Sequence, residues 1–354
     1  MADKNRTKRI ILTAVISLAA VALVLSVLAG SFFGVLLLRT NQVPQYELGT
    51  STTDSFHTEL QSAFLNDKYY WNISPYSDGK RELSRPLPLT IGWDTALIAA
   101  AYSVRISEDD DMGDYLSYSF DANAETEIYN LKLGTTYYCQ IYDALGLPIS
   151  EKQTLTTDTQ APGNMYVDGV TNVCDLGGWS IPEGRVRQGL IYRCGRLNEN
   201  KEETPVAKIT EKGVDTMLNE MKIKPEMDLR KVDDNEVGGL SDVGILGDSV
   251  NYYQCPMGYN GNMLINNADM VKHIFSDVLS KEENYPLIFH CSIGTDRTGL
   301  IAFLINGLLG VDINDLYRDY LFSNFGDIGG NRSVATITIT MMMAIQMKIQ
   351  IPRG

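Results

Sequence analysis

The chain has 354 residues, of which 44% are hydrophobic and 21% are charged, and its formal net charge is −14 at pH 7. This composition is typical of folded protein, so it excludes a largely disordered chain, and the length allows two domains with additional segments. The charge is +4 over residues 1–40, −11 over 41–160 and −7 over 161–354. Nucleic-acid binding is excluded, because proteins that bind nucleic acid present basic surfaces and the chain beyond residue 40 is acidic.

An apolar run near the amino terminus predicts a membrane anchor. Residues 10–38 carry no charge, and a helix of this length exceeds the roughly 30 Å hydrocarbon core of a bilayer. Residues 1–9 are basic and the segment after residue 40 is acidic, so the positive-inside rule places the amino terminus in the cytoplasm. We expect a single-pass protein of the cell membrane with everything after about residue 40 outside. A secreted protein is the alternative, since Val27-Leu28-Ala29 resembles a signal-peptide cleavage site.

Two different patterns follow the apolar run. Residues 41–85 are polar and show no sustained periodicity, so we expect a spacer with one short helix near 56–64. Residues 86–158 contain short alternating segments separated by turn residues, and this pattern predicts an antiparallel β-sandwich. The expected strands are 87–94, 101–108, 116–120, 125–131, 135–143 and 152–157.

The sandwich segment resembles a fibronectin type III domain. Trp93 lies in the first expected strand, and Leu131-Lys132-Leu133-Gly134-Thr135-Thr136-Tyr137 is similar to the run that forms the tyrosine corner of that family. Leu133 stands where the family has proline. The resemblance implies an all-β domain that either spaces the catalytic domain from the membrane or binds a partner.

Residues 160–354 predict an α/β domain with a central, mostly parallel sheet flanked by helices. A linker at 156–163 precedes it, and the periodicity then becomes mixed. The expected strands are 164–168, 190–193, 225–229, 250–255 and 286–290. The expected helices are 207–221, 267–280, 298–309, 312–323 and 333–348.

The chemistry is concentrated after the last expected strand. The apolar run 286–290 leads directly into Cys291-Ser292-Ile293-Gly294-Thr295-Asp296-Arg297-Thr298-Gly299, and an apolar helix begins at Leu300. A tight loop between a strand and a helix can direct successive backbone N–H groups to one anion at the positive end of the helix. We therefore expect a phosphate site formed by Ser292, Ile293, Gly294, Thr295, Asp296 and Arg297.

The loop also carries a candidate nucleophile. A thiol at a helix amino terminus beside a cation ionises more readily than a free one, so Cys291 is predicted to be a thiolate at neutral pH. Arg297 is predicted to hold two phosphate oxygens with its planar fork. We expect the Thr298 hydroxyl to hydrogen-bond the sulfur, and His290 to orient the loop backbone.

The string from His290 to Gly299 resembles the signature loop of protein tyrosine phosphatases. Asp296 directly before the arginine makes it most similar to the atypical bacterial tyrosine/dual-specificity branch. Three further stretches, at 172–179, 189–195 and 227–230, resemble that branch, and the likeness covers roughly residues 163–325.

The resemblance implies roles for further residues. Asp175, Arg193, Asp228 and Arg230 either shape the wall of the pocket or form buried ion pairs that hold the loop. Asp296 is the candidate general acid and base, because Tyr259-Asn260-Gly261-Asn262 offers no carboxyl group where many relatives have one. The alternative is that Asp269 or Asp175 supplies the proton.

The leading hypothesis is a protein tyrosine phosphatase, with dual specificity as an extension, that works through a phosphocysteine intermediate. The alternatives are a phosphoinositide or inositol phosphate phosphatase and an inactive phospho-binding adhesion protein. No cofactor is expected, and the dispersed cysteines and histidines predict no structural zinc site. If the domain lies outside the cell, we expect a disulfide between Cys174 and Cys194 as a hypothesis.

Overall fold

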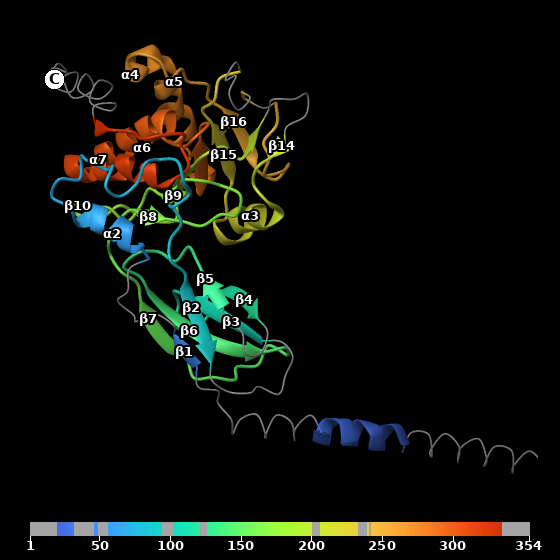
Figure 1. Ribbon diagram of the computed structural model, residues 1–354. Coiled ribbons are helices and arrows are strands. Elements are labelled where there is room, and N and C mark those ends of the chain that lie inside the picture. The colour runs from blue at the N-terminus through green and yellow to red at the C-terminus, as the bar shows by residue number, and fades with distance from the viewer. Residues whose placement is uncertain are drawn as a thin grey trace, which may run out of the picture. The chain divides into compact units, whose positions relative to one another are not determined.

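The computed structural model describes residues 20–31, 46–48, 56–93, 102–120, 126–199, 206–232, 239–240 and 242–334 (Figure 1). The chain divides into two compact units. The first comprises residues 1–48, 91–126 and 137–154, and the second comprises residues 49–90, 127–136 and 155–354.

Only part of the predicted anchor at 10–38 falls within the described residues. Residues 20–31 are helical, and their large apolar side chains are exposed, with Leu23 at 67%. Within the ranges given above, no helix has both the length and the apolar character needed to cross a bilayer. Anchoring of the chain to a membrane therefore stays a prediction.

Seven strands of the amino-terminal half form two sheets, in which β1 pairs with β2, and β3 pairs with β4 and β6, in antiparallel fashion. The three-stranded sheet has the order β1-β2-β5 and the four-stranded sheet the order β4-β3-β6-β7. Alternate residues of β3 and β6 are buried, and Val104 lies opposite Ile141, which is the pattern of sheets with one face in a core. The strands are β1 (Tyr46–Leu48), β2 (Leu89–Trp93), β3 (Tyr102–Ser107), β4 (Leu116–Phe120), β5 (Thr126–Ile128), β6 (Thr136–Asp143) and β7 (Gln153–Thr156). Strands thus form where alternation predicts them, while the fibronectin type III likeness stays a prediction.

The second unit contains a six-stranded sheet of order β16-β15-β17-β12-β9-β8. Four neighbouring strands are parallel, and β9 and β8 continue the sheet in antiparallel fashion. They are β12 (Ile191–Cys194), β15 (Pro225–Asp228), β16 (Asn251–Gln254), β17 (Leu287–His290), β9 (Cys174–Asp175) and β8 (Gly163–Asn164). Two short hairpins, β10 (Ser180–Ile181) with β11 (Gly184–Arg185) and β13 (Asn198–Glu199) with β14 (Val206–Ala207), complete the strands. The predicted mostly parallel sheet is confirmed, with a mixed edge.

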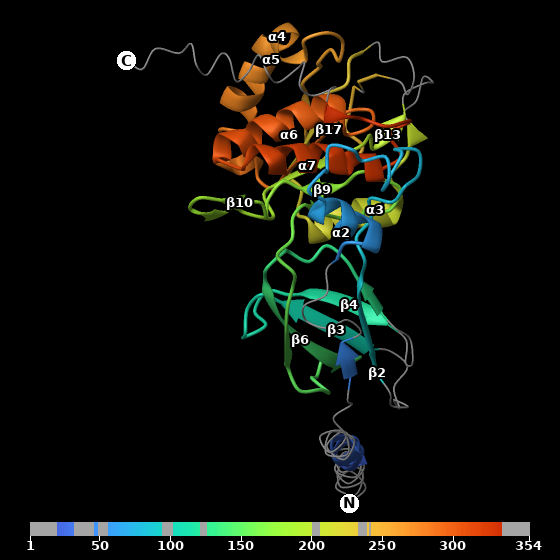
Figure 2. The ribbon, with the colours of Figure 1, turned by 60° about the vertical axis from the view of Figure 1, so that its left-hand side comes forward.

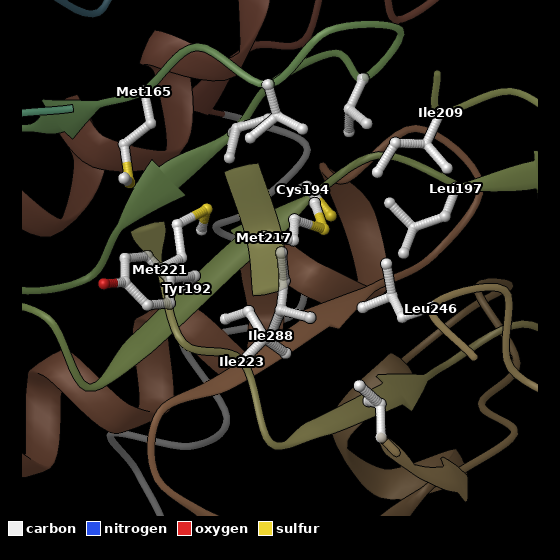
Figure 3. Packing of buried hydrophobic residues seen from close by; sticks show 14 residues of the cluster. Met165, Tyr192, Cys194, Leu197, Ile209, Met217, Met221, Ile223, Leu246 and Ile288 are labelled. Carbon is white, nitrogen blue, oxygen red and sulfur yellow. The ribbon is translucent and has the colours of Figure 1, made fainter. Parts of the chain in front are cut away.

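Helices cover both faces of this sheet. On one face, Leu287 and Phe289 pack with apolar residues of α6 (Asp296–Leu309) and η2 (Ile274–Val278). On the other face, Ile288 and Tyr192 pack with Met217 of η1 (Thr216–Glu220) (Figure 3). The remaining helices are α3 (Glu211–Asp215), α4 (Met263–Asn266), α5 (Ala268–His273), η3 (Glu282–Asn284), α7 (Ile313–Phe322) and η4 (Ser323–Phe325). Most of the predicted helix 333–348 lies outside the described residues.

The expected disulfide is absent, because Cys174 and Cys194 are both free and buried. Cys174 pairs directly with Arg193 across β9 and β12. Since successive side chains of a strand point to opposite faces, Cys194 lies on the face opposite to Cys174, in the cluster with Tyr192 and Ile288. The hypothesis of a bridge between them is wrong for this geometric reason.

The segment expected to be a spacer is packed onto the second unit. We call residues 56–88 the arm; it contains α2 (Glu59–Asn66), which starts with a capping box between Thr58 and Gln61. Phe64 and Ile73 are buried in a cluster with apolar residues of α7 and η4. Figure 2 shows the helix α2 close to α7. The sequence hides this role, because α2 is short and the rest of the arm is irregular chain held by individual hydrogen bonds.

Phe64→Ala should destabilise the protein by about 3–5 kcal/mol, because it leaves a cavity among packed aromatic side chains. Urea unfolding followed by tryptophan fluorescence would measure the change in the free energy of unfolding. Leu60→Ala, at a position of α2 that is 47% exposed, is the control and should change it by less than about 0.5 kcal/mol. Equal effects of the two substitutions would contradict the packing of the arm.

Candidate active site

The loop that follows β17 lies at the carboxyl ends of the parallel strands. β17 is hydrogen-bonded between β12 and β15, and α6 begins at Asp296 with Thr295 as its N-cap residue. Gly294 has φ +72°, and a Cβ at this position would lie 2.5 Å from the carbonyl oxygen of Cys194. Only glycine fits this turn, which brings the loop back against β12.

Two side chains hold the carbonyl groups of the loop from outside. The amide of Asn172 donates to the carbonyl oxygens of Ile293 (3.4 Å) and Gly294 (3.1 Å). The guanidinium of Arg196 donates to the carbonyl oxygen of Ser292 at 3.2 Å. Because N–H and C=O point in opposite directions across a trans peptide, carbonyls held outward leave the amides to face the interior. This arrangement is what an anion nest requires.

Cys291 differs electrostatically from the other cysteines. Burial raises the pKa of Cys139, Cys174 and Cys255 to about 12, and it raises the pKa of Cys194 as well. Cys291 is equally buried, and burial alone would raise its pKa, but the charge of Arg297 and hydrogen bonds from Thr298 outweigh burial and bring the pKa below its ordinary value. Neighbouring groups therefore make this one thiol ready to ionise.

The guanidinium of Arg297 is held by groups from three segments. It donates to the carbonyl oxygens of Met257 (3.3 Å) and Leu229 (3.4 Å) and to the hydroxyl of Ser292 (3.1 Å). The ring of Tyr259 lies over it, with 5.3 Å between the guanidinium carbon and the ring centroid. Arg297 is buried while Tyr259 is 52% exposed, so the aromatic ring lies between the arginine and solvent.

Asp296 is paired with an arginine that the sequence analysis did not identify. Nε and Nη2 of Arg332 lie 3.2 and 3.3 Å from the two carboxylate oxygens of Asp296. Burial raises the pKa of Tyr320, and the neighbouring charge of Asp296 raises it further.

The two alternative proton donors, Asp269 and Asp175, lie in different surroundings. Asp269 is exposed on α5. Both carboxylate oxygens of Asp175 accept backbone amides, from Gly177 and Gly189.

His290 is enclosed by acidic residues beneath the loop. Its Nε2 lies 3.0 Å from Glu226 Oε1, and its Nδ1 lies 3.4 Å from the carbonyl oxygen of Cys291. Burial lowers the pKa of His290, but the charge of Asp228 and the hydrogen bond to Glu226 outweigh burial and raise it above its ordinary value. Despite these acids, within the described ranges no group of three His, Cys, Asp or Glu side chains is placed to hold a metal ion.

The predicted supporting residues lie in buried polar contacts. Arg230 donates to both carboxylate oxygens of Asp228 and to Asn198, and the Arg230 and Asp228 side chains are completely buried. Arg193, also completely buried, donates to Asp319 of α7 at 3.2 Å. Burial raises the pKa of Asp175 to about 6, against the hydrogen bonds from its two amide donors. In these contacts the four residues hold strands, loop and α7 together.

Five residues near the loop had no role assigned from sequence: Asn172, Arg196, Glu226, Tyr259 and Arg332. Asn172 lies within the stretch 172–179, which resembles the family. Glu226 lies two residues before Asp228 on the same strand face. The sequence therefore carried a signal for both residues. Arg332 is 36 residues from Asp296 in irregular chain, and no pattern in the sequence connects the two.

Comparison with known proteins agrees with this geometry. The profile described as "Tyrosine phosphatase family" matches residues 165–344. The chain belongs to the tyrosine phosphatase family. No curated protein matches the chain.

Solved structures similar to this member of the tyrosine phosphatase family include the core catalytic domain of PP-IP phosphatase SIW14 from S. cerevisiae in complex with citrate. It shares 15% identity over 52% of this chain and 93% of that chain, with a TM-score of 0.30. A second structure, the Siw14 catalytic core, shares 14% identity over 45% of this chain and 86% of that chain, with a TM-score of 0.28.

The lowered pKa of Cys291 predicts the pH dependence of its alkylation by iodoacetate, followed by peptide mass mapping. The thiolate reacts, so the rate should fall as pH falls, with a midpoint below that of an ordinary thiol. Arg297→Ala removes the stabilising charge and should move the midpoint to higher pH. Arg297→Lys keeps the charge and should leave the midpoint near that of the wild type. The assignment fails if the alanine and lysine variants titrate alike.

Proposed function

We propose that this protein hydrolyses phosphomonoesters through a phosphocysteine intermediate and that its substrate class is phosphotyrosine in proteins. The observation that carries the proposal is that Arg297 donates to the hydroxyl of Ser292 at 3.1 Å, directly after the buried Cys291 in the chain, and the charge of Arg297 helps to lower the pKa of that thiol. Binding of a phosphate alone would need no ionisable thiol, so this placement favours an enzyme over an inactive phospho-binding protein.

In the first step, the loop amides and Arg297 bind the phosphoryl oxygens, and the Cys291 thiolate attacks phosphorus. An S–P bond forms as the P–O bond to the leaving group breaks. The electron pair goes to the leaving oxygen, which takes a proton from Asp296. The amides and the guanidinium stabilise the charge on the equatorial oxygens, which is the main catalytic contribution of such a site.

In the second step, water attacks the phosphocysteine and Asp296 accepts the proton of the water. The S–P bond breaks, its electron pair returns to Cys291 as a thiolate, and inorganic phosphate leaves. The buried Thr298 hydroxyl, for which the described residues offer no other hydrogen-bond partner, can donate to the departing thiolate. The cycle uses only side chains of this chain and water.

The position of Tyr259 supports an aromatic leaving group. Its loop is held by two hydrogen bonds between Gly258 and the Asn267 side chain, at 2.7 and 2.8 Å. The half-exposed ring beside Arg297 offers a flat apolar surface next to the phosphate position, where a phenyl ring can stack. A phosphoserine side chain is too short to use this surface.

Hydrolysis of p-nitrophenyl phosphate and of matched phosphopeptides tests the function. The wild type should hydrolyse both classes of substrate, and Cys291→Ser should reduce the rate to that of a blank without enzyme. The wild type should hydrolyse the phosphotyrosine peptide with a higher kcat/KM than the phosphoserine peptide. Tyr259→Ala should reduce this difference, mainly by raising KM for the phosphotyrosine peptide. Tyr259→Phe, which keeps the ring, is the matched control and should retain it.

Other results would overturn parts of this proposal. Activity retained in Cys291→Ser would exclude the phosphocysteine mechanism. A soluble phosphoinositide or inositol phosphate could instead be hydrolysed faster than the phosphotyrosine peptide. The proposed substrate class would then be wrong, and the proposed mechanism would still hold.

Asp296→Asn should lower kcat by about 10²- to 10⁴-fold, the usual contribution of a general acid. The loss should be larger for an alkyl phosphate than for p-nitrophenyl phosphate, because nitrophenolate leaves without a proton. Kinetics with both substrates would measure this difference. An equal loss of kcat/KM, which reports the first step alone, on both substrates would show that Asp296 is not the general acid.

We also propose that the apolar run at 10–38 anchors the protein in a membrane and that a fibronectin type III-like domain separates the anchor from the catalytic unit. The charge asymmetry around the run and the exposed apolar side chains of residues 20–31 support the anchor. The strand positions and the buried Tyr137 support the domain. Protease access to tags at each end in intact cells would establish the orientation.

A further inference from the structure

The arm precedes the family match at 165–344, yet it contacts the residues that hold the catalytic loop. We propose that residues 56–88 are a positioning element of the active site, which fixes Asn172 on one side of the loop and Arg332 on the other. This inference rests on the proposed function and adds residues that the tyrosine phosphatase match does not include.

The first connection runs through Ser84 to Asn172. The Ser84 hydroxyl accepts the backbone N–H of Asn172 at 3.2 Å, and the Ser84 carbonyl accepts the Asn164 side chain at 2.8 Å. Glu82 in turn accepts the Ser84 hydroxyl at 2.5 Å and, with its other oxygen, the hydroxyl of Thr171. The arm thus binds the backbone N–H of Asn172 through Ser84 and the side chain of Thr171 through Glu82.

Asn172 has a left-handed backbone conformation, with φ +56°, which asparagine adopts more readily than most residues other than glycine. This conformation sets the direction of its side chain, and the contacts of the arm help to keep it. The same residue donates to the carbonyl oxygens of Ile293 and Gly294. If Asn172 relaxed, these peptides could rotate and their amides would no longer face the interior of the loop that begins at Cys291. Ser84 and Glu82 therefore act on the shape of the loop through Asn172.

The second connection runs through Ser77 to Asp296. The Ser77 hydroxyl donates to the carbonyl oxygen of Asn324 at 2.5 Å. The Asn324 side chain accepts the backbone N–H of Arg332 at 2.6 Å and donates to its carbonyl oxygen at 3.1 Å. Arg332 then holds the carboxylate of Asp296. Ser77 and Asn324 are buried, so water does not compete for these hydrogen bonds.

The chain supports the second connection along its backbone as well. The carbonyl oxygen of Gly79 accepts the N–H groups of Ile328 (3.0 Å) and Gly330 (2.9 Å). Gly79 has φ +69°, and a Cβ there would lie 2.7 Å from the carbonyl oxygen of Gly330. The arm and the segment that leads to Arg332 are therefore fitted closely to each other, and both belong to the same unit.

The first test compares full-length Ser84→Ala and Glu82→Ala with wild type by the pH dependence of Cys291 alkylation with iodoacetate. Each variant should move the midpoint to higher pH by about 0.5 to 1 unit, the size expected when one hydrogen bond that supports a charged group is lost. Arg81→Ala, at an exposed neighbouring position, is the matched control. This variant should keep the wild-type midpoint.

The second test compares Ser77→Ala with Arg332→Ala by steady-state kinetics. Both should lower kcat with little change in KM, and both should lower it more for an alkyl phosphate than for p-nitrophenyl phosphate, because the change acts through Asp296. Circular dichroism and a thermal melt of every variant define the temperature at which it is folded, and the measurements are made below it.

The results separate this inference from the proposed function. Lower melting temperatures with unchanged alkylation midpoints and unchanged leaving-group dependence would overturn it and make the arm a stabilising segment alone. Alkylation of Cys291 needs no substrate. The first test therefore measures the effect of the arm on the thiol even if Cys291→Ser retains activity and the phosphocysteine mechanism is excluded. Ser84→Ala removes one oxygen atom, so it is the variant least able to unfold the protein.

Discussion

A buried sulfur anion has to be compensated, and this requirement governs the active site. Burial disfavours the charged form of any thiol, as it does at the other four cysteines. At Cys291 a guanidinium and hydrogen bonds reverse the effect. The compensation works only while the loop keeps its shape, so every contact that holds the loop carbonyls outward also acts on the sulfur.

The sheet that carries the loop, the buried ion pairs beside it and the arm keep the loop rigid. β17 lies in the middle of the parallel strands, and the ion pairs of Arg230 with Asp228 and of Arg193 with Asp319 are buried beside it. A buried ion pair adds little net stability, yet breaking one leaves an uncompensated charge at a cost of about 3–5 kcal/mol. Such pairs therefore specify one arrangement of strands, loop and α7 instead of merely strengthening it. The arm supplies the corresponding restraint at Asn172 and Arg332.

Local patterns were sufficient where a single element carries the signal. Alternation predicted the strands β2 to β7 within a few residues, and the apolar run before Cys291 predicted β17 together with the turn into α6. Local patterns did not predict contacts between residues that are distant in sequence. The arm was expected to be a spacer, and the pairing of Cys174 with Cys194 failed because register put the two on opposite faces of the sheet.

The sequence by itself determined the reactive loop, because strand, glycine turn, cysteine and arginine lie within a dozen consecutive residues and their geometry is local. The tertiary structure alone decided what surrounds that loop. Asn172, Arg332 and the arm reach it from segments that lie as many as 247 residues apart. Contacts over such distances arise from packing and from the pairing of buried polar groups, which no local period in the sequence encodes.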